Sequence, residues 1–506
     1  MDADATKQAP GAKGRFQLDV FRISLPLCVI VGLWGIVAPD QLARFASSIT
    51  RITYTSVDWF FLLSVTGFVV LMLYLGYGRF GKLRLGAEGD EPEFSTPSWI
   101  AMLFAAGMGV GLLFWGAAEP VLHFMNAPGV KGGTKAAAQN AMVVTAFHWG
   151  LHAWACYGLG ALVLAYFGFR RRLPYLPGAP LRGVFKGRWV RPTAFSADLI
   201  AVLAVAFGVA GSLAMGIFQL QAGLHVVTGI SNDSIWVAVG ILVALVTAYL
   251  ASATTGLDKG IKWLSNINMA LAIALMLAVF LASETSHLMR VFVSSTGDYV
   301  SRLISITLQT YPQEVGDDWL QKWTLTYFIW WIAWAPFVGV FIARISRGRT
   351  LREFVTGVLI VPTVFSLLWF AIFGGTALHE EMHGAGGIAE LVNQDVTVAL
   401  FTLFERLPGS SLLSVIAMLL DFIFLVTSAD SATYVLGMLT SDGAYDPPVR
   451  RKVSWGVTIG AMGAALMLSK NIHAVRSMTV LGALPFTLVM MLQAAALWRA
   501  LRRERT

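Results

Sequence analysis

Residues 330–350 read WWIAWAPFVGVFIARISRGRT, an apolar run that ends in three arginines. At roughly 100° per residue, Trp330, Trp331 and Trp334 fall within an arc of about 100° on one helix face. The π faces of tryptophan attract a cation, including a quaternary ammonium group that has no hydrogen to donate. Basic residues at the end of an apolar run are typical of a membrane boundary. The stretch therefore predicts a membrane helix with a cation-attracting face.

The composition extends this prediction to the whole chain. Of 506 residues, 56% are hydrophobic and 13% are charged, and the mean hydropathy is +0.67. These values exclude an ordinary soluble domain and indicate an all-α polytopic membrane protein. Apolar stretches long enough to cross about 30 Å of hydrocarbon predict 12 transmembrane helices. They lie near residues 21–39, 59–77, 98–125, 141–167, 197–228, 235–252, 263–283, 320–345, 354–379, 411–439, 453–469 and 476–500.

Basic residues indicate the orientation of the chain. An even number of spans leaves both termini on one side, and that side collects most of the 37 lysines and arginines. By the positive-inside rule, both termini are cytoplasmic. The net charge of +8 is then an orientation signal, and no nucleic-acid partner is expected. The first apolar run has no cleavage site and is interpreted as an anchor.

The spans predict one membrane domain, residues 21–500, between a cytoplasmic segment 1–20 and a short cytoplasmic tail 501–506. Spans three to seven, about 97–283, and spans eight to twelve, about 319–500, divide its core into two five-helix halves. Residues 284–312 mix apolar and charged side chains, a pattern typical of a helix along the outer interface. Cys28 and Cys156 fall inside spans, so neither a disulfide framework nor a zinc site is predicted.

Two spans contain residues that suit an ion site. The glycines of GMGVG, residues 107–111, lower the cost of unwinding a helix, although GxxxG is also a close-packing motif. TSADSAT, residues 427–433, places hydroxyls and Asp430 in an apolar span, where Asp430 could also join two helices. Breaks in both spans would collect five neutral oxygens, which suit sodium better than a divalent ion. They are the carbonyls of Ala105, Met108 and Phe424 and the hydroxyls of Thr427 and Ser428.

The fourth span contributes further aromatic side chains. Trp149, Trp154 and Tyr157 lie on one broad helix face. A belt of aromatic residues at the membrane surface is the alternative reading, and it fits Trp59 and Trp99 at the ends of their spans. The aromatic residues of the fourth and eighth spans lie well inside the membrane instead. Two such helices can form a box around a cation.

Four motifs together resemble the betaine/carnitine/choline transporter family. They are AAGMGVGLLFWGAAEP at 105–120, FHWGLHAWACYG at 147–158, the stretch at 330–350 and FLVTSADSATYVLGM at 424–438. The likeness runs in order from the first span to the last. It implies a LeuT-like core of two inverted five-helix repeats preceded by two extra helices. It also implies a homotrimer in the inner membrane of a bacterium, embedded in membrane lipid, with the interfacial helix at the subunit contacts.

The resemblance also assigns roles to residues. Trp149, Trp154, Tyr157 and Trp331 match the family's trimethylammonium box, Trp330 and Trp334 its substrate pathway, and Phe337 an inner-gate aromatic. Ser212 matches a substrate contact. Met108 and Gly111 of the glycine stretch are also expected to contact the substrate. Ala105, Met108, Phe424, Thr427 and Ser428 match a sodium site.

One departure from the family concerns a second sodium ion. Members with two sodium ions have two threonines one helical turn apart in the fifth span, where this chain has Val205 and Val209. Valine has the shape of threonine without its oxygen. The second site is therefore predicted to be lost.

The expected substrate is a zwitterion moved by sodium symport. Choline-type members tend to have an aspartate at the position of Gly111, whereas a zwitterion brings its own carboxylate, which free backbone N–H groups can hold. Glycine betaine is the first choice, and ectoine, proline betaine or dimethylsulfoniopropionate is the alternative. Proton-coupled choline uptake and carnitine-type exchange are further alternatives. No cofactor is expected, with sodium acting only as the coupling ion.

Two other classes of protein remain open. An ion channel would need a continuous polar pore, and the spans contain only isolated polar residues. An intramembrane enzyme would need a nucleophile and base or a metal set. His148 and His152 are four residues apart but have no carboxylate near them in sequence. Glu119 and Pro120 lie near the end of the glycine-rich span, where the proline can stop or kink the helix, and Glu119 is interpreted as a structural or outer-gate residue.

Overall fold

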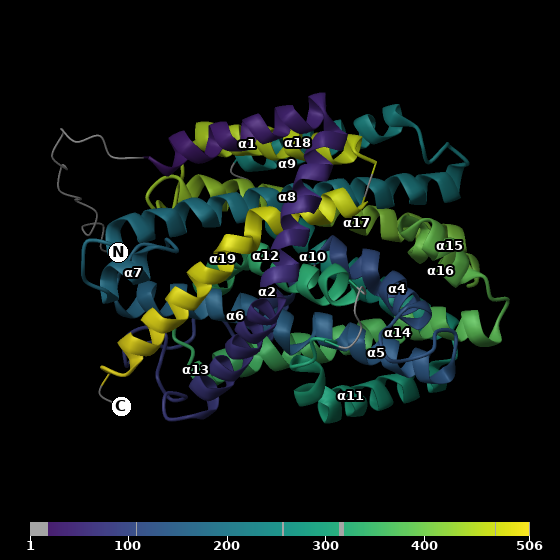
Figure 1. The fold of residues 1–506 in the computed structure, drawn as a ribbon, viewed down its shortest axis with the longest axis horizontal. Helices are drawn as coiled ribbons and strands as arrows, with labels where there is room; N and C mark the ends of the chain where they lie inside the picture. The colour runs from purple at the N-terminus through teal and green to yellow at the C-terminus, as the bar shows by residue number, and fades with distance from the viewer. Residues whose placement is uncertain (1–18, 108, 256–257, 313–317, 471, 505–506) are drawn as a thin grey trace.

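The computed structural model describes residues 19–504, apart from residues 108, 256–257, 313–317 and 471. In these residues the chain is helical, and its β-structure is limited to isolated bridges between Arg84 and Thr350 and between Ala127 and Val130. Apolar segments form helices in a membrane because hydrocarbon offers no partners to free backbone groups. The all-α polytopic fold predicted from the sequence is confirmed (Figure 1).

Fifteen of the helices have twelve or more residues. They are α1 (Val20–Val37), α2 (Pro39–Tyr77), α3 (Thr96–Gly107), α4 (Val110–Met125), α5 (Lys135–Trp149), α6 (Leu151–Ala165), α8 (Val190–Thr228), α9 (Ile235–Thr255), α10 (Asp258–Ala282), α11 (Thr285–Thr307), α12 (Thr326–Ile345), α14 (Val361–His383), α17 (Ser410–Leu439), α18 (Val449–Leu468) and α19 (Ile472–Leu501). The short helices are α7 (Ala179–Val184), α13 (Leu351–Val355), α15 (Ile388–Gln394) and α16 (Ala399–Glu405), with single π-helical turns at Tyr166–Arg170, Gln321–Leu325 and Thr356–Ile360.

Nine helical stretches in the described part of the chain are long and apolar enough to cross a membrane. The bent pair α10 and α11 makes a tenth if it is one span. Two predicted spans do not meet this measure. α3 and α4 are each too short because one helix ends at Gly107 and the next begins at Val110, and the first turn of α18 contains Arg450, Arg451 and Lys452. The count of 12 therefore stays a prediction.

The contacts between helices show how the two halves of the core correspond. α6, in the second span of the first half, packs on α12, the first span of the second half. In the same way α14, in the second span of the second half, packs on α4, in the first span of the first half. α8 contacts α19 as α17 contacts α10, and α8 contacts α18 as α17 contacts α9. Exchanging the halves α3–α10 and α12–α19 therefore maps one set of contacts onto the other. This is the five-plus-five arrangement expected from the sequence.

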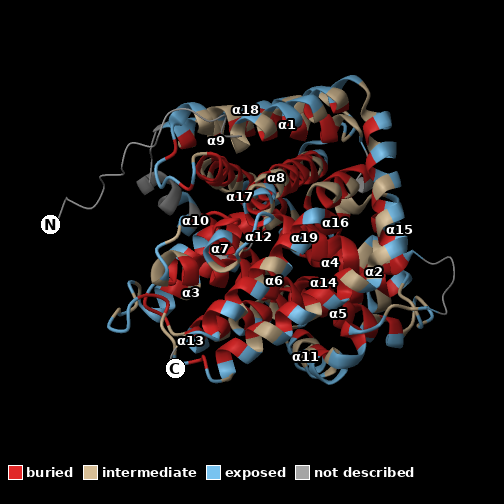
Figure 2. Cartoon of the chain, turned by 60° about the vertical axis from the view of Figure 1, so that its left-hand side comes forward, coloured by how far each residue is buried: buried red, intermediate tan, exposed pale blue. Residues whose placement is uncertain are grey.

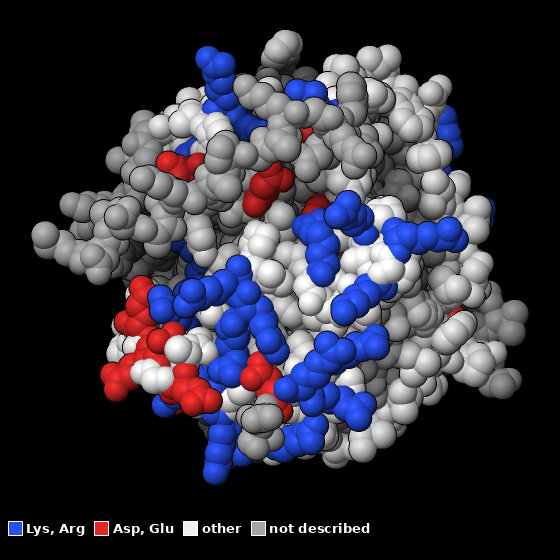
Figure 3. Space-filling model, turned by 90° about the vertical axis from the view of Figure 1, so that its left-hand side faces the viewer, with Lys and Arg blue, Asp and Glu red and all other residues white. Residues whose placement is uncertain are grey.

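The two extra helices and α11 lie at the periphery of this core. α1 packs on α18, and α2 packs on α19 and α6. α11 bends away from α10 by 112°, as a separate helix within residues 284–312. Figure 2 shows α4, α6, α8 and α12 largely buried, whereas α1, α18 and α11 have exposed sides. Lys and Arg gather on the face near α7 and α13, where α19 ends (Figure 3).

Two glycines bring α6 and α12 into close contact. A Cβ on Gly339 would lie 3.1 Å from the backbone nitrogen of Ala161, and one on Gly160 would lie 3.3 Å from the carbonyl of Ala335. Small residues at such a contact let two backbones approach closely inside a membrane. The aromatic side chains of the two helices are thereby held next to one another.

Candidate functional site

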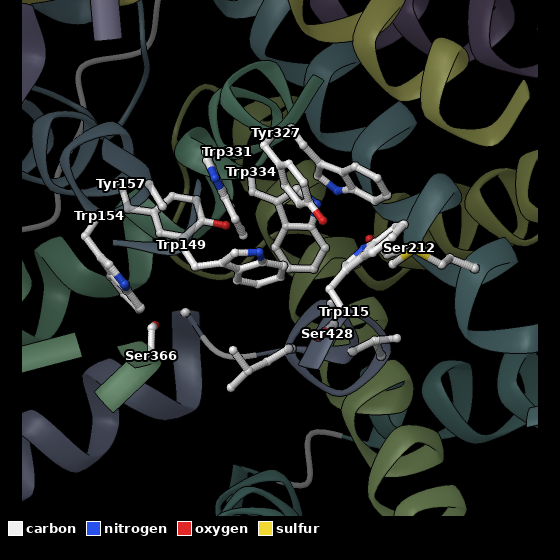
Figure 4. Close-up of a pocket in the computed structure, with 18 of the residues that line it drawn as sticks. Trp115, Trp149, Trp154, Tyr157, Ser212, Tyr327, Trp331, Trp334, Ser366 and Ser428 are labelled. Atoms are coloured by element: carbon white, nitrogen blue, oxygen red, sulfur yellow. The ribbon is translucent and has the colours of Figure 1, made fainter. Parts of the chain in front are cut away.

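A cavity bordered mainly by α4, α6, α8, α12 and α17, with Trp149 of α5 and Ser366 of α14, contains the aromatic residues singled out in the sequence (Figure 4). It has about 750 Å³ of empty space, part of which is open to solvent. Every predicted substrate contact except Met108, which lies outside the described residues, lines this cavity. The lining residues are Gly107, Gly109, Val110, Gly111, Leu112, Trp115, Trp149, Ala153, Trp154, Tyr157, Ser212, Met215, Tyr327, Trp330, Trp331, Trp334, Ser366, Leu425 and Ser428.

The rings of the predicted box stand nearly at right angles to one another. The centroids of Trp149 and Trp331 are 4.8 Å apart with an interplanar angle of 75°. Tyr157 lies 5.8 Å from Trp331 at 83°, and Trp154 lies 5.7 Å from Tyr157 at 81°. Edge-to-face pairs of this kind are favourable, and each leaves a ring face available for a third group. The arrangement can surround a cation with negative ring faces.

A break between α5 and α6 positions Trp331. α5 ends at Trp149 and α6 begins at Leu151, with Gly150 between them outside helical geometry. The carbonyl of His148 is therefore free of the helix and accepts a hydrogen bond from Trp331 Nε1 at 2.9 Å. On the other side, the N–H of Leu151 donates to Tyr299 Oη of α11 at 3.1 Å. This break is not predictable from the sequence, because only a single glycine, Gly150, marks it.

A buried carboxylate fixes the second ring of the box. Glu119 of α4 is fully buried, and its Oε2 accepts a hydrogen bond from Trp149 Nε1 at 2.6 Å. Its Oε1 lies 2.6 Å from Nδ1 of His148 and 3.2 Å from Nε2 of His123. His148 Nε2 lies 2.9 Å from the hydroxyl of Thr324. Glu119 therefore holds the indole of Trp149 by its polar edge while the ring face lines the cavity.

One positively charged side chain, that of Arg476, already packs on aromatic rings beside the cavity. The guanidinium carbon of Arg476 lies 4.4 Å from the ring centroid of Trp115 and 4.8 Å from that of Trp323. Arg476 is buried, with 8% of its surface exposed. A desolvated contact of this type contributes about 2 kcal/mol or more. Aromatic side chains beside the cavity thus stabilise a positive charge away from water.

The start of α4 offers backbone N–H groups to the cavity. Gly109, which precedes α4, makes no side-chain cap, and Gly109, Val110 and Gly111 all line the cavity. The first N–H groups of a helix have no intrahelical partner, and they form the positive end of the helix dipole. A Cβ at Gly111 would lie 3.1 Å from the ring of Trp149. Glycine there leaves room for the indole beside an anion-binding helix end.

The predicted sodium ligands are only partly described. Met108 and the side chain of Ala105 lie outside the described residues. Ser428 lines the cavity, and the hydroxyl of Thr427 donates to the carbonyls of Ile423 at 2.9 Å and Phe424 at 3.2 Å. The expectation of a break here is wrong, because α17 is continuous from Ser410 to Leu439. Threonine satisfies its hydroxyl on the preceding turn, so a polar sequence does not require an unwound helix.

The remaining predicted residues occupy separate places around the cavity. Ser212 donates its hydroxyl to the carbonyl of Gly208 at 3.2 Å within α8. Phe337 lies outside the cavity lining and packs on Trp334, with centroids 5.4 Å apart. Val205 and Val209 are buried aliphatic residues of α8.

The sequence allows Asp430 to join two helices and predicts that Trp59 and Trp99 belong to an aromatic belt at the membrane surface. Ser252 of α9 donates to Asp430 Oδ2 at 2.8 Å, which fits a residue that joins two helices. Trp59 is 53% exposed, as expected for an aromatic belt. Trp99 is only 1% exposed, and its Nε1 donates to Ser346 Oγ at 3.0 Å, so the belt reading is wrong for it.

Two aromatic residues of the cavity, Trp115 and Tyr327, were not predicted from the sequence. Tyr327 precedes Trp331 by four residues, and the two rings stack with centroids 6.2 Å apart and an angle of 21°. Trp323 precedes Tyr327 by the same spacing and stacks in the same way at 6.3 Å. Residues four apart share a helix face, so this spacing was the signal that could have found Tyr327.

Two groups of side chains among the described residues have spacing suited to a metal ion. They are Glu119, His123 and His148, and Glu284, His287 and His379. The first group is occupied by its own hydrogen bonds and by Trp149 and Thr324. The His148 and His152 pair weighed from the sequence is divided, because His152 hydrogen-bonds Thr307 instead.

Comparison with known proteins gives a consistent picture. A family model described as BCCT, betaine/carnitine/choline family transporter, matches residues 19–506. An ectoine/hydroxyectoine transporter of Virgibacillus pantothenticus is 40% identical, covering 96% of each chain. The glycine betaine transporter OpuD of Bacillus subtilis is 41% identical, covering 96% of this chain and 94% of that protein. A solved structure of a Na⁺-coupled sialic acid symporter is 14% identical, with a TM-score of 0.46 over 86% of each chain, a likeness too low to bear on fold or coupling.

Proposed function

The chain belongs to the betaine/carnitine/choline transporter family, and we propose that it imports a quaternary ammonium zwitterion, glycine betaine foremost, by sodium symport. As a member of this family it is a transporter and not an enzyme. The observation that carries the proposal is that the rings of Trp149 and Tyr157 each stand nearly perpendicular to the ring of Trp331 at one cavity.

The charge of the cavity favours a zwitterion over a simple cation. None of the described lining residues carries a formal charge. A cation without its own anion would leave water for a site with no counter-charge, which is costly in an apolar setting. A zwitterion avoids this cost, because its carboxylate neutralises the molecule. The aromatic rings then receive the ammonium group, and the N–H groups at the start of α4 receive the carboxylate.

Sodium coupling is proposed from the hydroxyl-bearing face of α17. Ser428 lines the cavity, and the oxygens of Thr427 and Phe424 are 3.2 Å apart. Two neutral oxygens at this distance can share one small cation once the hydroxyl turns its proton away. Together with carbonyls from the broken span of α3 and α4, they would form the predicted shell of Ala105, Met108, Phe424, Thr427 and Ser428. A single sodium ion per substrate is proposed, since Val205 and Val209 offer no oxygen.

Uptake of ectoine is the second candidate function. The relatives described as ectoine and glycine betaine transporters are 40% and 41% identical to this chain, so identity alone does not separate the two solutes. Both solutes combine a cationic group with a carboxylate, but the amidinium of ectoine has N–H groups to donate, whereas the quaternary ammonium of betaine has none. A quaternary ammonium group fits the perpendicular rings best, because it binds through its whole methyl surface.

The setting of the protein follows from the same proposal. We place it in the inner membrane of a bacterium, with both termini cytoplasmic and with the basic face of Figure 3, near α7, α13 and the end of α19, on the cytoplasmic side. Trp236 of α9, which is 81% exposed, would then contact lipid. A homotrimer with α11 at the subunit contacts is the proposed assembly.

Uptake into proteoliposomes tests this function. Purified protein should accumulate labelled glycine betaine only with an inward sodium gradient, and excess unlabelled betaine should compete more strongly than ectoine or choline. Trp331→Leu should abolish most of the uptake, whereas Trp236→Leu, at an exposed surface position, should leave it intact. Equal uptake without sodium would contradict the coupling, and stronger competition by ectoine would reverse the choice of substrate.

A further inference from the structure

Three histidines and a glutamate gather where α10, α11 and α14 meet, outside the aromatic cavity. His379 and His383 lie four residues apart in the last turns of α14, and their ring centroids are 5.3 Å apart. His287, in the first turn of α11, lies 4.7 Å from His379 between ring centroids. Glu284 is the residue immediately before α11. The donor atoms of Glu284, His287 and His379 all lie within 4.8 Å of one another.

The sequence of this turn has a spacing used by metal sites. Residues 379–383 read HEEMH, in which two histidines four residues apart lie on one helix face. The HExxH pattern binds zinc through its two histidines in many unrelated proteins. By itself the motif is a weak signal. Here a second helix brings a third histidine and a carboxylate to the same face, which completes a donor set suited to zinc.

The ligand atoms are not used by other groups in the structure. Nδ1 of His379 is shielded from solvent and has no hydrogen-bond partner. Glu284 occupies the cap position of α11, yet its carboxylate does not cap the helix. By contrast, Glu381 on the same turn is committed, because its carboxylate accepts from the N–H of Ala389 at 3.1 Å. The guanidinium of Arg290 is turned to Ser286 Oγ, at 2.9 Å.

The helices that hold these side chains are already fixed to one another one turn away. Thr376 of α14 lies 3.1 Å from Ser283, in the corner between α10 and α11, between hydroxyl oxygens. Leu288 of α11 packs so closely on α14 that a Cβ at Gly375 would lie 3.2 Å from it. A metal would therefore meet a preformed corner. The donor atoms of Glu284, His287 and His379 already lie within 4.8 Å of one another, so side-chain adjustment alone would bring them to the roughly 3.4 Å separation of a tetrahedral site.

We propose that Glu284, His287, His379 and His383 form a binding site for a divalent transition metal, zinc being the best match. Imidazole donors favour zinc over sodium or magnesium, which prefer oxygen ligands. Glu284 and His383 are exposed, so the metal can enter from solvent. Once bound, it joins the start of α11 to the end of α14. Zinc should therefore stabilise the folded protein without occupying the aromatic cavity.

Isothermal titration calorimetry with ZnCl₂ tests the site. The full chain is purified without a histidine tag and stripped of metal with EDTA. We expect one zinc ion per chain and a higher unfolding temperature in its presence. His287→Gln and His379→Gln should each lower the affinity on the order of 10- to 100-fold or more. The matched control is His225→Gln, an exposed histidine near the end of α8 that should bind zinc as the unchanged protein does.

A second measurement guards against a folding defect in the variants. Glu284 is exposed, so Glu284→Gln should leave the metal-free unfolding temperature unchanged while weakening zinc binding. Co²⁺ bound by the unchanged protein should show the visible absorption of a tetrahedral site, and that absorption should be lost in the His379 variant. Absence of saturable zinc binding, or unchanged affinity in the His287 and His379 variants, would overturn the proposal.

Discussion

Trp149 donates its indole N–H to Glu119 over 2.6 Å, and neither residue is more than 7% exposed. The carboxylate comes from α4 and the indole from the last residue of α5. The indole of Trp149, which lines the cavity, is thereby oriented by the carboxylate of Glu119, which does not. Glu119 is a positioning residue for the aromatic box, and this makes it a target for mutation.

Glu119→Gln should weaken glycine betaine binding while leaving the protein folded. The amide keeps the shape but loses the charge that strengthens the bonds from Trp149 and His148. Loss of about 1–3 kcal/mol corresponds to roughly a 5- to 150-fold rise in KM. The measurement is betaine uptake together with tryptophan fluorescence, which reports the displaced indole. Glu390→Gln, an exposed carboxylate on α15, is the control, and equal effects of the two changes would contradict this role.

Trp331→Phe and Trp331→Leu should differ in their effects on binding. Phenylalanine retains a π face but cannot donate to the carbonyl of His148, whereas leucine loses both interactions. One cation–π contact contributes about 0.5–2 kcal/mol, so leucine should weaken betaine binding roughly 2- to 30-fold beyond phenylalanine. Quenching of tryptophan fluorescence by betaine gives the dissociation constants. Identical constants for the two variants would show that the ring face does not bind the cation.

Gly111→Asp should admit choline. The new carboxylate would supply the counter-charge that the described cavity lining lacks. Its Cβ would lie 3.1 Å from the ring of Trp149, so the indole must shift slightly and betaine uptake should fall. Competition assays with choline and betaine measure the change. Gly111→Asn is the isosteric control without charge, and choline uptake in that variant would rule out the electrostatic explanation.

Thr427→Val should raise the sodium concentration needed for half-maximal uptake, with little change in betaine affinity at saturating sodium. Valine removes the hydroxyl that lies 3.2 Å from the carbonyl of Phe424 and keeps the side-chain shape. Thr433→Val on the same helix, where the hydroxyl bonds the Asp430 carbonyl, is the matched control.

The double change Val205→Thr and Val209→Thr should raise the sodium Hill coefficient above that of the unchanged protein. An unaltered coefficient would argue against a lost second site.

The end of α19 should loosen in acid. Burial raises the pKa of Glu504, but hydrogen bonds from Arg170 at 2.9 Å and Tyr166 at 2.6 Å outweigh it and hold that pKa below its usual range. A lowered pKa in the folded state means that the stabilisation is present above the unfolded value of about 4.3 and is lost as the pH falls below it. The unfolding temperature of Glu504→Gln should consequently depend less on pH between about 5 and 3. An identical pH profile would exclude this contact as the acid-sensitive one.

The sequence predicted what depends on hydrophobicity and local spacing. It gave the helical membrane fold, the break at residues 107–111 and the aromatic faces of the fourth and eighth spans. It could not predict the pairing of Glu119 with His148 at the end of the following helix, since that contact depends on packing. It also could not show that Thr427 satisfies its hydroxyl on its own helix. The break at Gly150 is likewise set by its partners, Tyr299 and Trp331.

The hydrogen bond from Leu151 N–H to Tyr299 Oη connects the rim of the molecule with the wall of the cavity. If α11 slid along the membrane surface, a backbone donor would lose its partner within apolar surroundings, at a cost of about 1–3 kcal/mol. Tyr299 therefore ties the position of α11 to the break at Gly150, where the neighbouring carbonyl of His148 holds the indole of Trp331.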